Sequence, residues 1–133
     1  MISFARQGRP ARIVARANSL AEADVIEALY DASRAGVSID LIIRGICSLV
    51  PGVPGVSDNI TVRSIIDRFL EHSRVFRFEN GGAPEIYISS GDWLPRNFFK
   101  RVETTFPVLD PEVLRRIEQE ILPIALADNV KAW

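Results

Sequence analysis

The sequence predicts an α/β fold in which helices flank one mixed sheet. Segments of β-branched apolar residues alternate along the chain with segments whose apolar residues recur at helical spacing. The first strand, helix and strand follow one another in the order of a parallel crossover unit. Further along, Asn80-Gly81-Gly82 predicts a tight turn between two antiparallel strands.

Length and composition favour one soluble domain over residues 1–133. Hydrophobic residues make up 47% of the chain and charged residues 25%, which excludes a disordered tail or a fibre. Sixteen Lys and Arg against 17 Asp and Glu leave a formal net charge of −1, so we expect no nucleic-acid partner. The sequence shows neither a signal peptide nor a transmembrane segment, and a cytoplasmic location is expected.

The first crossover unit is expected within the first 46 residues. Residues 12–17 predict a short strand, and Ser19 is the predicted N-cap of the helix that follows, with Glu22 as its capping-box partner. That helix is expected to end at a C′ glycine, Gly36. Residues 37–46 are rich in β-branched side chains and predict a central strand covered on both faces.

The next part of the predicted sheet is a hairpin. Pro and Gly residues interrupt the chain over residues 48–58, and residues 62–71 are expected to form a helix with Ile65, Ile66, Phe69 and Leu70 on its inner face. Residues 73–79 and 85–90 predict the two strands that the glycine turn joins.

A final amphipathic helix is expected over residues 110–126. A loop over residues 91–97 and a strand-like stretch over residues 100–108 lead to it. Asp110 is its predicted N-cap, and a proline follows at the first helical position. Pro123 is expected to break or kink the helix.

Arginine carries nearly all of the positive charge. Of the 16 basic residues 14 are Arg, and the chain has one histidine, His72. Two explanations stay open: the base composition of the genome, and the suitability of the planar guanidinium for phosphate oxygens. The arginines on predicted tails and solvent faces are expected to be background, namely Arg6, Arg9, Arg34, Arg115 and Arg116.

An anion site is predicted where the central strand ends. Arg44 lies at the carboxyl end of that strand, and ligands of open α/β sheets collect beyond such ends. Gly45 beside it lets the backbone approach a ligand closely. The alternative is that Arg44 forms a structural ion pair.

His72-Ser73-Arg74 is a second candidate. Residues two apart in a strand share a face, so His72 and Arg74 would address one site, and Arg77 would lie on the opposite face. A histidine there could carry a proton or contact a phosphate. The alternative is a hydrogen-bonded structural histidine.

A third candidate cluster follows the hairpin. The turn should bring the end of the second hairpin strand toward the same end of the sheet as His72. Hydroxyls, an amide and a guanidinium suit phosphate oxygens, whereas the alternative is a polar loop capped by an aspartate. The residues concerned are Ser89, Ser90, Asp92, Arg96 and Asn97.

Other site patterns are missing from the sequence. The segment PGVPG over residues 51–55 is not a Walker-type phosphate loop, because it lacks GxxxxGK[ST] and no lysine follows it. The acidic residues show no metal-ligand spacing, so no protein ligand for a metal is named. Cys47, the single cysteine, is expected to be a buried inert thiol.

The segments RGIC, PGVPG, EHSR, NGG and SSGDWLPRN occur in this order, and about residues 9–108 resemble the C-terminal part of bacterial polyphosphate kinase. That family extends inorganic polyphosphate from ATP. The resemblance implies a phospholipase-D-like α/β domain, the second of two such catalytic domains in the family. It also implies that His72-Ser73-Arg74 with Glu79 is a degenerate form of an H-x-K-x4-D arrangement.

The resemblance further implies a site for ATP, in which Arg44 and His72 line the nucleotide and His72 assists phosphoryl transfer. The phosphorylated nucleophile of the family is a different histidine, in the first catalytic domain. The expected partners are therefore ATP with Mg2+, polyphosphate, and the remaining polyphosphate kinase domains in cis or in trans. The isolated chain is expected to be inactive.

The candidate residues follow from position and resemblance together. His72 is the catalytic candidate, and the candidates for ATP or phosphate binding are Arg44, His72, Arg74, Asp92, Arg96 and Asn97. Inside the matched region the chain departs from the family at several positions. Val50, Ala83 and Phe99 stand where the family often has Arg, Asp and Asp, and Gly91 and Leu94 replace Ala and Met.

Two other functions stay open. One is a non-catalytic polyphosphate- or nucleotide-binding module. The other is a phosphodiesterase of the phospholipase D type, which would need a homodimer to pair two copies of His72. Separation from a sister domain would also expose an apolar face and favour a homo-oligomer, with Trp93, Phe98, Phe99 and Trp133 as its candidates.

Overall fold

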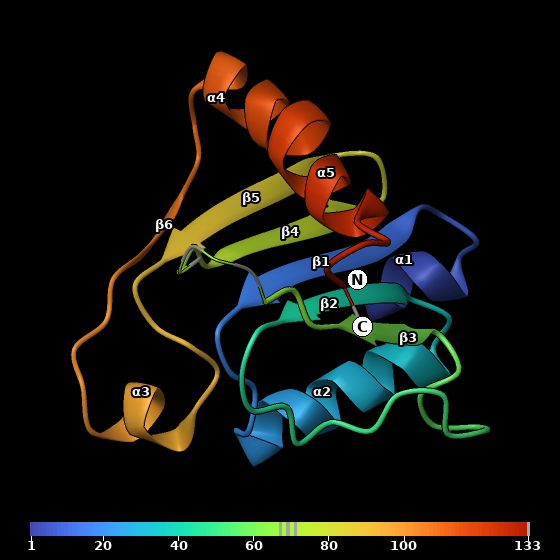
Figure 1. Cartoon of the computed structure of the whole chain (residues 1–133). Coiled ribbons are helices and arrows are strands. Elements are labelled where there is room, and N and C mark those ends of the chain that lie inside the picture. The colour runs from blue at the N-terminus through green and yellow to red at the C-terminus, as the bar shows by residue number, and fades with distance from the viewer. Residues whose placement is uncertain (67, 69, 71, 133) are drawn as a thin grey trace.

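A six-stranded sheet forms the centre of the computed structural model, which describes residues 1–66, 68, 70 and 72–132 (Figure 1). The strands lie in the order β3-β2-β1-β4-β5-β6. β1, β2 and β3 run parallel to one another, whereas the pairs β1–β4, β4–β5 and β5–β6 are antiparallel. The predicted mixed sheet, with its crossover and its hairpin, is confirmed. The strands are β1 (Ala11–Ala17), β2 (Ser38–Ile43), β3 (Ile60–Arg63), β4 (Val75–Asn80), β5 (Pro84–Ser89) and β6 (Thr105–Pro107).

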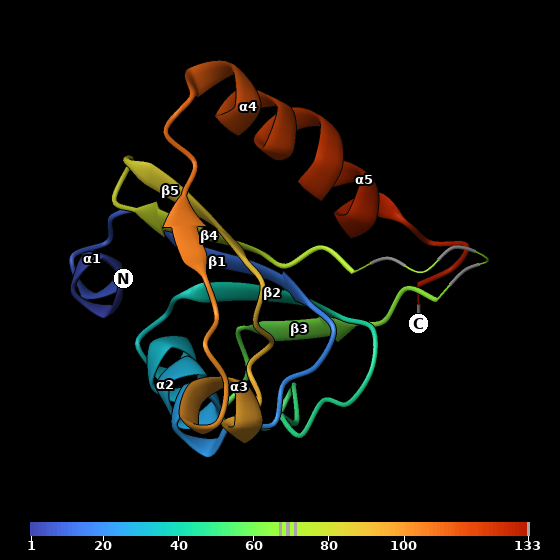
Figure 2. The same ribbon diagram turned by 90° about the vertical axis from the view of Figure 1, so that its left-hand side faces the viewer.

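Helices cover both faces of this sheet. Figure 2 shows the C-terminal helical segment on one side of the strands, and α2 and α3 on the other. None of the helices in the described part of the chain is long and apolar enough to cross a membrane. The helical elements are α1 (Ile2–Arg6), α2 (Ala23–Arg34), α3 (Pro95–Phe99), α4 (Pro111–Arg116), the π-helix η1 (Ile117–Ile121) and α5 (Leu122–Ala127).

The central strand β1 is buried on both faces. Ile13, Ala15 and Ala17 pack in a cluster with α2, while Val14 packs with Ile117 of η1 in a second cluster. Successive side chains of a strand point to opposite faces, so a strand covered on both sides is apolar at nearly every position. This burial holds the end of β1 in place at the candidate site.

The predicted start of α2 is wrong. Glu22, and not Ser19, is the N-cap residue, and its side chain makes no capping hydrogen bond. The chain stays extended beyond β1 because Leu20 forms single parallel bridges with Cys47 and with Trp93. The predicted end of the helix is confirmed, since Gly36 follows the C-cap with φ of 90°, a conformation that favours glycine.

The helix predicted over residues 62–71 is also wrong. Strand β3 occupies its start and pairs with β2, and the Thr61 hydroxyl donates to the Asp40 carboxylate at 2.8 Å. The described residues that follow are not helical, and Phe69 lies outside the described residues. Ile66 and Leu70, expected on an inner face, are exposed. Tertiary pairing of the β-branched segment at residues 60–62 outweighs the helical spacing that follows it.

The remaining differences concern short elements. Helix α1 is not predicted, and α3 begins within the predicted loop 91–97 and extends beyond it to Phe99, with Pro95 well suited to its first turn. The strand-like stretch 100–108 contains the three-residue strand β6.

The predicted cap of the last helix is confirmed. The Asp110 carboxylate accepts hydrogen bonds from the backbone N–H groups of Glu112 and Val113 at 2.9 and 3.0 Å. At Pro123 the chain does not leave the helix: η1 precedes this residue, and α5 continues beyond it. The wider π turn adapts the hydrogen-bond pattern just before a residue that lacks an N–H.

Candidate functional site

A groove of about 670 Å³ lies beyond the carboxyl ends of β1 and β2. Arg44, just after β2, and Arg96, in α3, line it together, as the two separate sequence arguments expect. Gly45 also lines it, and a Cβ at this position would lie 3.0 Å from the Asn18 carbonyl oxygen. Glycine therefore lets the two chain segments approach closely where the groove forms.

Arg44 is held by its backbone. Its N–H donates to the Ala17 carbonyl at 3.3 Å, and its own carbonyl accepts from the Ser64 hydroxyl at 3.0 Å. Its side chain is half-buried, whereas that of Arg96 is exposed. The end of β2 therefore sets the position of one guanidinium, and the short helix α3 sets the position of the other.

His72 and Arg74 lie side by side just before β4. The two terminal guanidinium nitrogens of Arg74 are 3.0 and 3.3 Å from the His72 ring nitrogens Nε2 and Nδ1. The His72 ring is exposed, while the Arg74 side chain is 11% exposed. A neutral imidazole has one acceptor nitrogen and one N–H donor, so at most one of the two ring nitrogens can accept from Arg74.

Asp92 fixes the Arg74 guanidinium from its other side. Its carboxylate accepts from Arg74 Nε at 2.9 Å and from the backbone N–H of Asn18 at 2.8 Å, and the side chain is 4% exposed. Burial raises the pKa of Asp92, but the hydrogen bonds from Arg74 and Asn18 outweigh burial, and the pKa lies below its usual value. A charged carboxylate therefore links the end of β1 to Arg74 and, through it, to His72.

Asn97 lies apart from the groove that Arg44 and Arg96 line. It is buried, and its amide nitrogen donates to Glu103 at 2.7 Å. Glu103 also accepts from the Ser90 hydroxyl, and the hydrogen bonds from Ser90 and Asn97 lower its pKa. Asn97 and Asp92 both line a second hollow of about 670 Å³, partly walled by aromatic rings.

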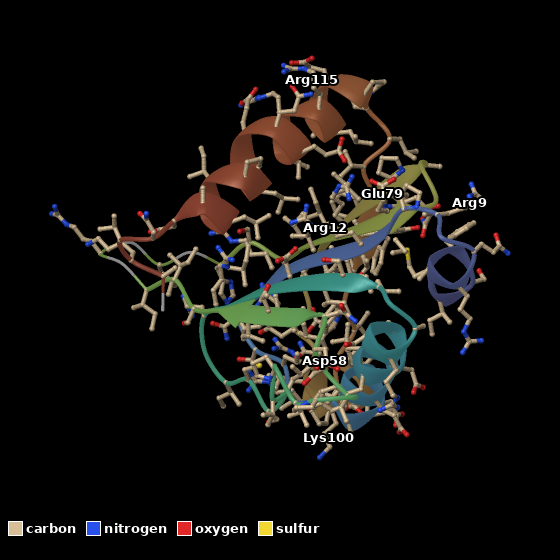
Figure 3. The ribbon with its side chains drawn as sticks, turned by 90° about the vertical axis from the view of Figure 1, so that its right-hand side faces the viewer. Arg9, Arg12, Asp58, Glu79, Lys100 and Arg115 are labelled. Carbon is tan, nitrogen blue, oxygen red and sulfur yellow. The ribbon has the colours of Figure 1, made fainter. Side chains whose placement is uncertain are left out.

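Glu79 does not join His72 and Arg74. It lies at the far end of β4 and pairs with Arg77, which also binds Glu118 of η1 at 2.7 Å. Arg77 therefore occupies the face opposite Arg74, as expected. In Figure 3, Glu79 lies between the strands and the C-terminal helical segment. Although His72, Arg74 and Glu79 have the spacing of an H-x-K-x4-D arrangement, Glu79 therefore does not lie at the site.

Sequence reasoning missed Asn18 and Glu103. Asn18 lines the groove and donates to Asp92, and the rule that ligands collect beyond strand ends, applied to the first strand, could have found it. For Glu103 the sequence offers no such signal, since it follows α3 in a stretch expected to be a strand.

Among the described residues no group of three or more His, Cys, Asp or Glu side chains could hold a metal. Cys47 is half-buried, and burial raises the pKa of its thiol.

The family of the chain is shown by comparison with known proteins. The family model described as polyphosphate kinase C-terminal domain 2 matches residues 1–133, beyond both ends of the expected match. The polyphosphate kinase of Xylella fastidiosa (strain Temecula1) is 57% identical over 131 residues, and that of Burkholderia vietnamiensis is 57% identical over 132. These alignments cover 98% and 99% of this chain, which spans about 19% of each relative's length.

Solved structures agree with this assignment and with the fold. The crystal structure of polyphosphate kinase from Porphyromonas gingivalis matches with a TM-score of 0.94 at 50% identity, over 98% of this chain and 20% of that one. Nuc of Salmonella typhimurium, a phospholipase D family member, has a TM-score of 0.66 at 16% identity, over 94% of this chain and 84% of that one. This second likeness shows the fold alone, a phospholipase-D-like α/β domain. The chain belongs to the family of the polyphosphate kinase C-terminal domain 2.

Proposed function

We propose that this chain provides the nucleotide- and polyphosphate-binding half of a polyphosphate kinase active site. The reaction is the reversible transfer of the terminal phosphoryl group of ATP to a histidine and from there to the end of a polyphosphate chain. The observation that supports this proposal best is the series His72–Arg74–Asp92, in which a buried carboxylate holds a guanidinium against an exposed imidazole. The location that fits the proposal is the cytoplasm, where ATP is available.

Each residue of the site has a role that follows from its placement. Arg44 and Arg96 line one groove and would bind phosphate oxygens, since two guanidinium groups can bind several oxygens at once. Arg74 would neutralise the charge that develops on the transferring group, because Asp92 has already oriented it. His72 would carry a proton or hold the transferring group, because its exposed ring lies beside the guanidinium that Asp92 orients.

Two groups come from outside this chain. The phosphorylated histidine would come from the sister catalytic domain, since His72 is the single histidine of these 133 residues. Mg2+ would enter with ATP as part of the substrate, because magnesium binds phosphate oxygens and keeps several waters. Phosphoryl transfer depends mainly on positioning and charge stabilisation, which is what the arginines of this domain can supply.

Binding of MgATP and of polyphosphate to the isolated chain tests the proposal. Isothermal titration should show both ligands binding, with an affinity for polyphosphate that falls as salt rises. Arg44→Ala and Arg96→Ala should each weaken polyphosphate binding about tenfold. The matched control is Arg115→Ala, an exposed arginine on α4, which should leave binding unchanged. Equal affinity in all four proteins would contradict the groove assignment.

A measurement of catalytic turnover distinguishes an enzyme domain from a non-catalytic binding module. A chimera in which this chain replaces the matched part of the Xylella fastidiosa polyphosphate kinase should form polyphosphate from ATP, because the two segments are 57% identical. His72→Ala in that chimera should lower the rate while leaving polyphosphate binding in place. A chimera that binds both ligands and does not turn over would instead favour the non-catalytic module.

A further inference from the structure

The chain turns after α5 and forms a short C-terminal tail, which we define as residues 128–132. The Asp128 carboxylate accepts hydrogen bonds from the backbone N–H groups of Val130 and Lys131 at 2.9 and 2.8 Å. The hydrogen bonds from Lys131 and Val130 lower the pKa of Asp128. An aspartate that binds the backbone N–H groups shortly after it closes a tight turn, so the tail has a defined direction.

The tail returns to the sheet beside β3. Ala132 forms an isolated antiparallel bridge with Ile65, two residues beyond the end of β3. The Arg63 guanidinium, at the end of β3, donates through Nη1 to the Leu126 carbonyl in the last turn of α5. The last carbonyls of a helix lack partners within the helix, so this hydrogen bond ties α5 to β3. Figures 1 and 2 both show the tail alongside the chain that leaves β3.

The segment that the tail holds also borders the candidate site. The Ser64 hydroxyl donates to the Arg44 carbonyl at 3.0 Å. Ile65 lines one narrow hollow together with Arg44 and Ser73, and Ser73 directly follows His72 in the sequence. Ile65 therefore lies beside both parts of the site, the arginine that follows β2 and the histidine that precedes β4.

His72 depends on this segment more than Arg44 does. The Arg44 backbone follows β2 directly and is also fixed by its N–H bond to the Ala17 carbonyl. In contrast, the side chains that the structure describes between Ile65 and Arg74 are all exposed. Exposed side chains contribute little packing, so the position of His72 depends on how the chain is held at Ile65 and at Arg74.

From this arrangement we infer that the C-terminal tail is a positioning element for His72. The bridge at Ile65 fixes one end of the segment that carries the imidazole, and the ion pair of Arg74 with Asp92 fixes the other. The ring is thereby held beside the Arg74 guanidinium, which the proposed function assigns to the transferring phosphoryl group. The inference rests on the proposed function for its effect on catalysis, whereas the placement of His72 is independent of it.

Variants of the turn test the inference, and turnover of the Xylella fastidiosa chimera is the first measurement. Asp128→Ala and Val130→Pro each remove hydrogen bonds of the turn and should lower kcat about tenfold, because the imidazole is no longer held in place. The KM for polyphosphate should stay within about twofold, since Arg44 keeps its backbone anchors. Asp128→Asn keeps an acceptor oxygen and should retain the wild-type kcat. The matched control is Asp24→Ala, an exposed aspartate in α2, which should leave kcat unchanged.

The position of His72 has a direct readout, because it is the only histidine of these 133 residues. In a proton–carbon correlation spectrum of the isolated chain, the signal of its Cε1–H group should shift in Asp128→Ala and in Val130→Pro. The signal should stay in place in Asp128→Asn and in Asp24→Ala. Far-UV circular dichroism of the four variants checks that a shifted signal comes from a folded chain.

The outcomes separate this inference from the proposed function. A kcat of Asp128→Ala equal to that of Asp24→Ala would overturn the inference, and so would a lowered kcat with an unchanged His72 signal. A chimera that does not turn over in any form would count against the proposed function. In that case the isolated chain decides: a shifted signal supports the placement of His72 by the tail, and an unchanged signal overturns it.

Discussion

At the scale of single residues, the site depends on one buried ion pair. Asp92 and Arg74 are 4% and 11% exposed, and Asp92 also accepts from the backbone of Asn18. Removing one partner of such a pair leaves a buried charge without compensation. The same pair therefore contributes to stability and orients the guanidinium beside His72.

Asp92→Asn should destabilise the isolated chain by about 3 kcal/mol, since the Arg74 guanidinium would keep its charge and lose its partner. Urea unfolding followed by far-UV circular dichroism measures the change. Asp24→Asn is the matched control, the same chemical change at an exposed position in the first turn of α2. An Asp92→Asn variant as stable as the control would show that the ion pair does not support the fold.

The same pair gives a pH dependence with a defined sign. The pKa of Asp92 is lowered in the folded chain, so its contribution is fully present above the unfolded value of about 3.9 and is lost as pH falls through the folded pKa. The stability difference between the wild-type chain and Asp92→Asn should therefore shrink below about pH 4. Urea unfolding of both proteins at pH 7, 4 and 3 measures it, and a constant difference would contradict the assignment.

At the scale of secondary-structure elements, helix caps and pairing with distant segments determine which signals in the local sequence are realised in the fold. The Asp110 cap is satisfied entirely by its own helix, through hydrogen bonds to Glu112 and Val113, and the sequence signal for it is correct. Ser19 carries a similar signal, yet its segment pairs with residues distant in sequence, and α2 starts later. A capping signal is therefore reliable where no strand competes for the same backbone.

Asp110→Ala should cost about 1 kcal/mol of stability, because two N–H groups at the start of α4 lose their acceptor. Thermal unfolding of the isolated chain gives the change, with Glu27→Ala in α2 as a control for removing an exposed acid from a helix. If both variants melt at the same temperature as the wild-type chain, the cap does not stabilise this helix.

At the scale of the whole molecule, the proposed function assigns to this chain one side of a site whose other side lies outside these 133 residues. The pair Arg44 and Arg96 and the pair His72 and Arg74 lie at the same end of the sheet. The fold is a phospholipase-D-like domain, and the chain spans about a fifth of the polyphosphate kinases that it matches.

The isolated chain should therefore take no phosphate from ATP onto histidine. Incubation with γ-labelled ATP and Mg2+, followed by analysis for acid-labile phosphate, checks this, with the full-length Xylella fastidiosa enzyme as the positive control. The reason is that the proposed function makes His72 a proton carrier or a phosphate contact beside Arg74, and takes the phosphorylated histidine from outside these 133 residues. Phosphohistidine on the isolated chain would refute this division of roles.

The sequence by itself determined the mixed α/β sheet, the Asp110 cap and the family. These follow from local periodicity, turn and cap chemistry, and residue motifs, which need no knowledge of distant contacts. Tertiary structure decided what depends on distant pairing: that residues 60–63 form β3, that Asp92 binds Arg74, that Glu79 pairs with Arg77 on the far side of the sheet, and that Asn97 is buried against Glu103. Such contacts join residues whose separation in the sequence gives no indication that they lie close together in space. The sheet register, the burial of β1 and the position of α3 decide which of these residues lie at the candidate site and which lie away from it.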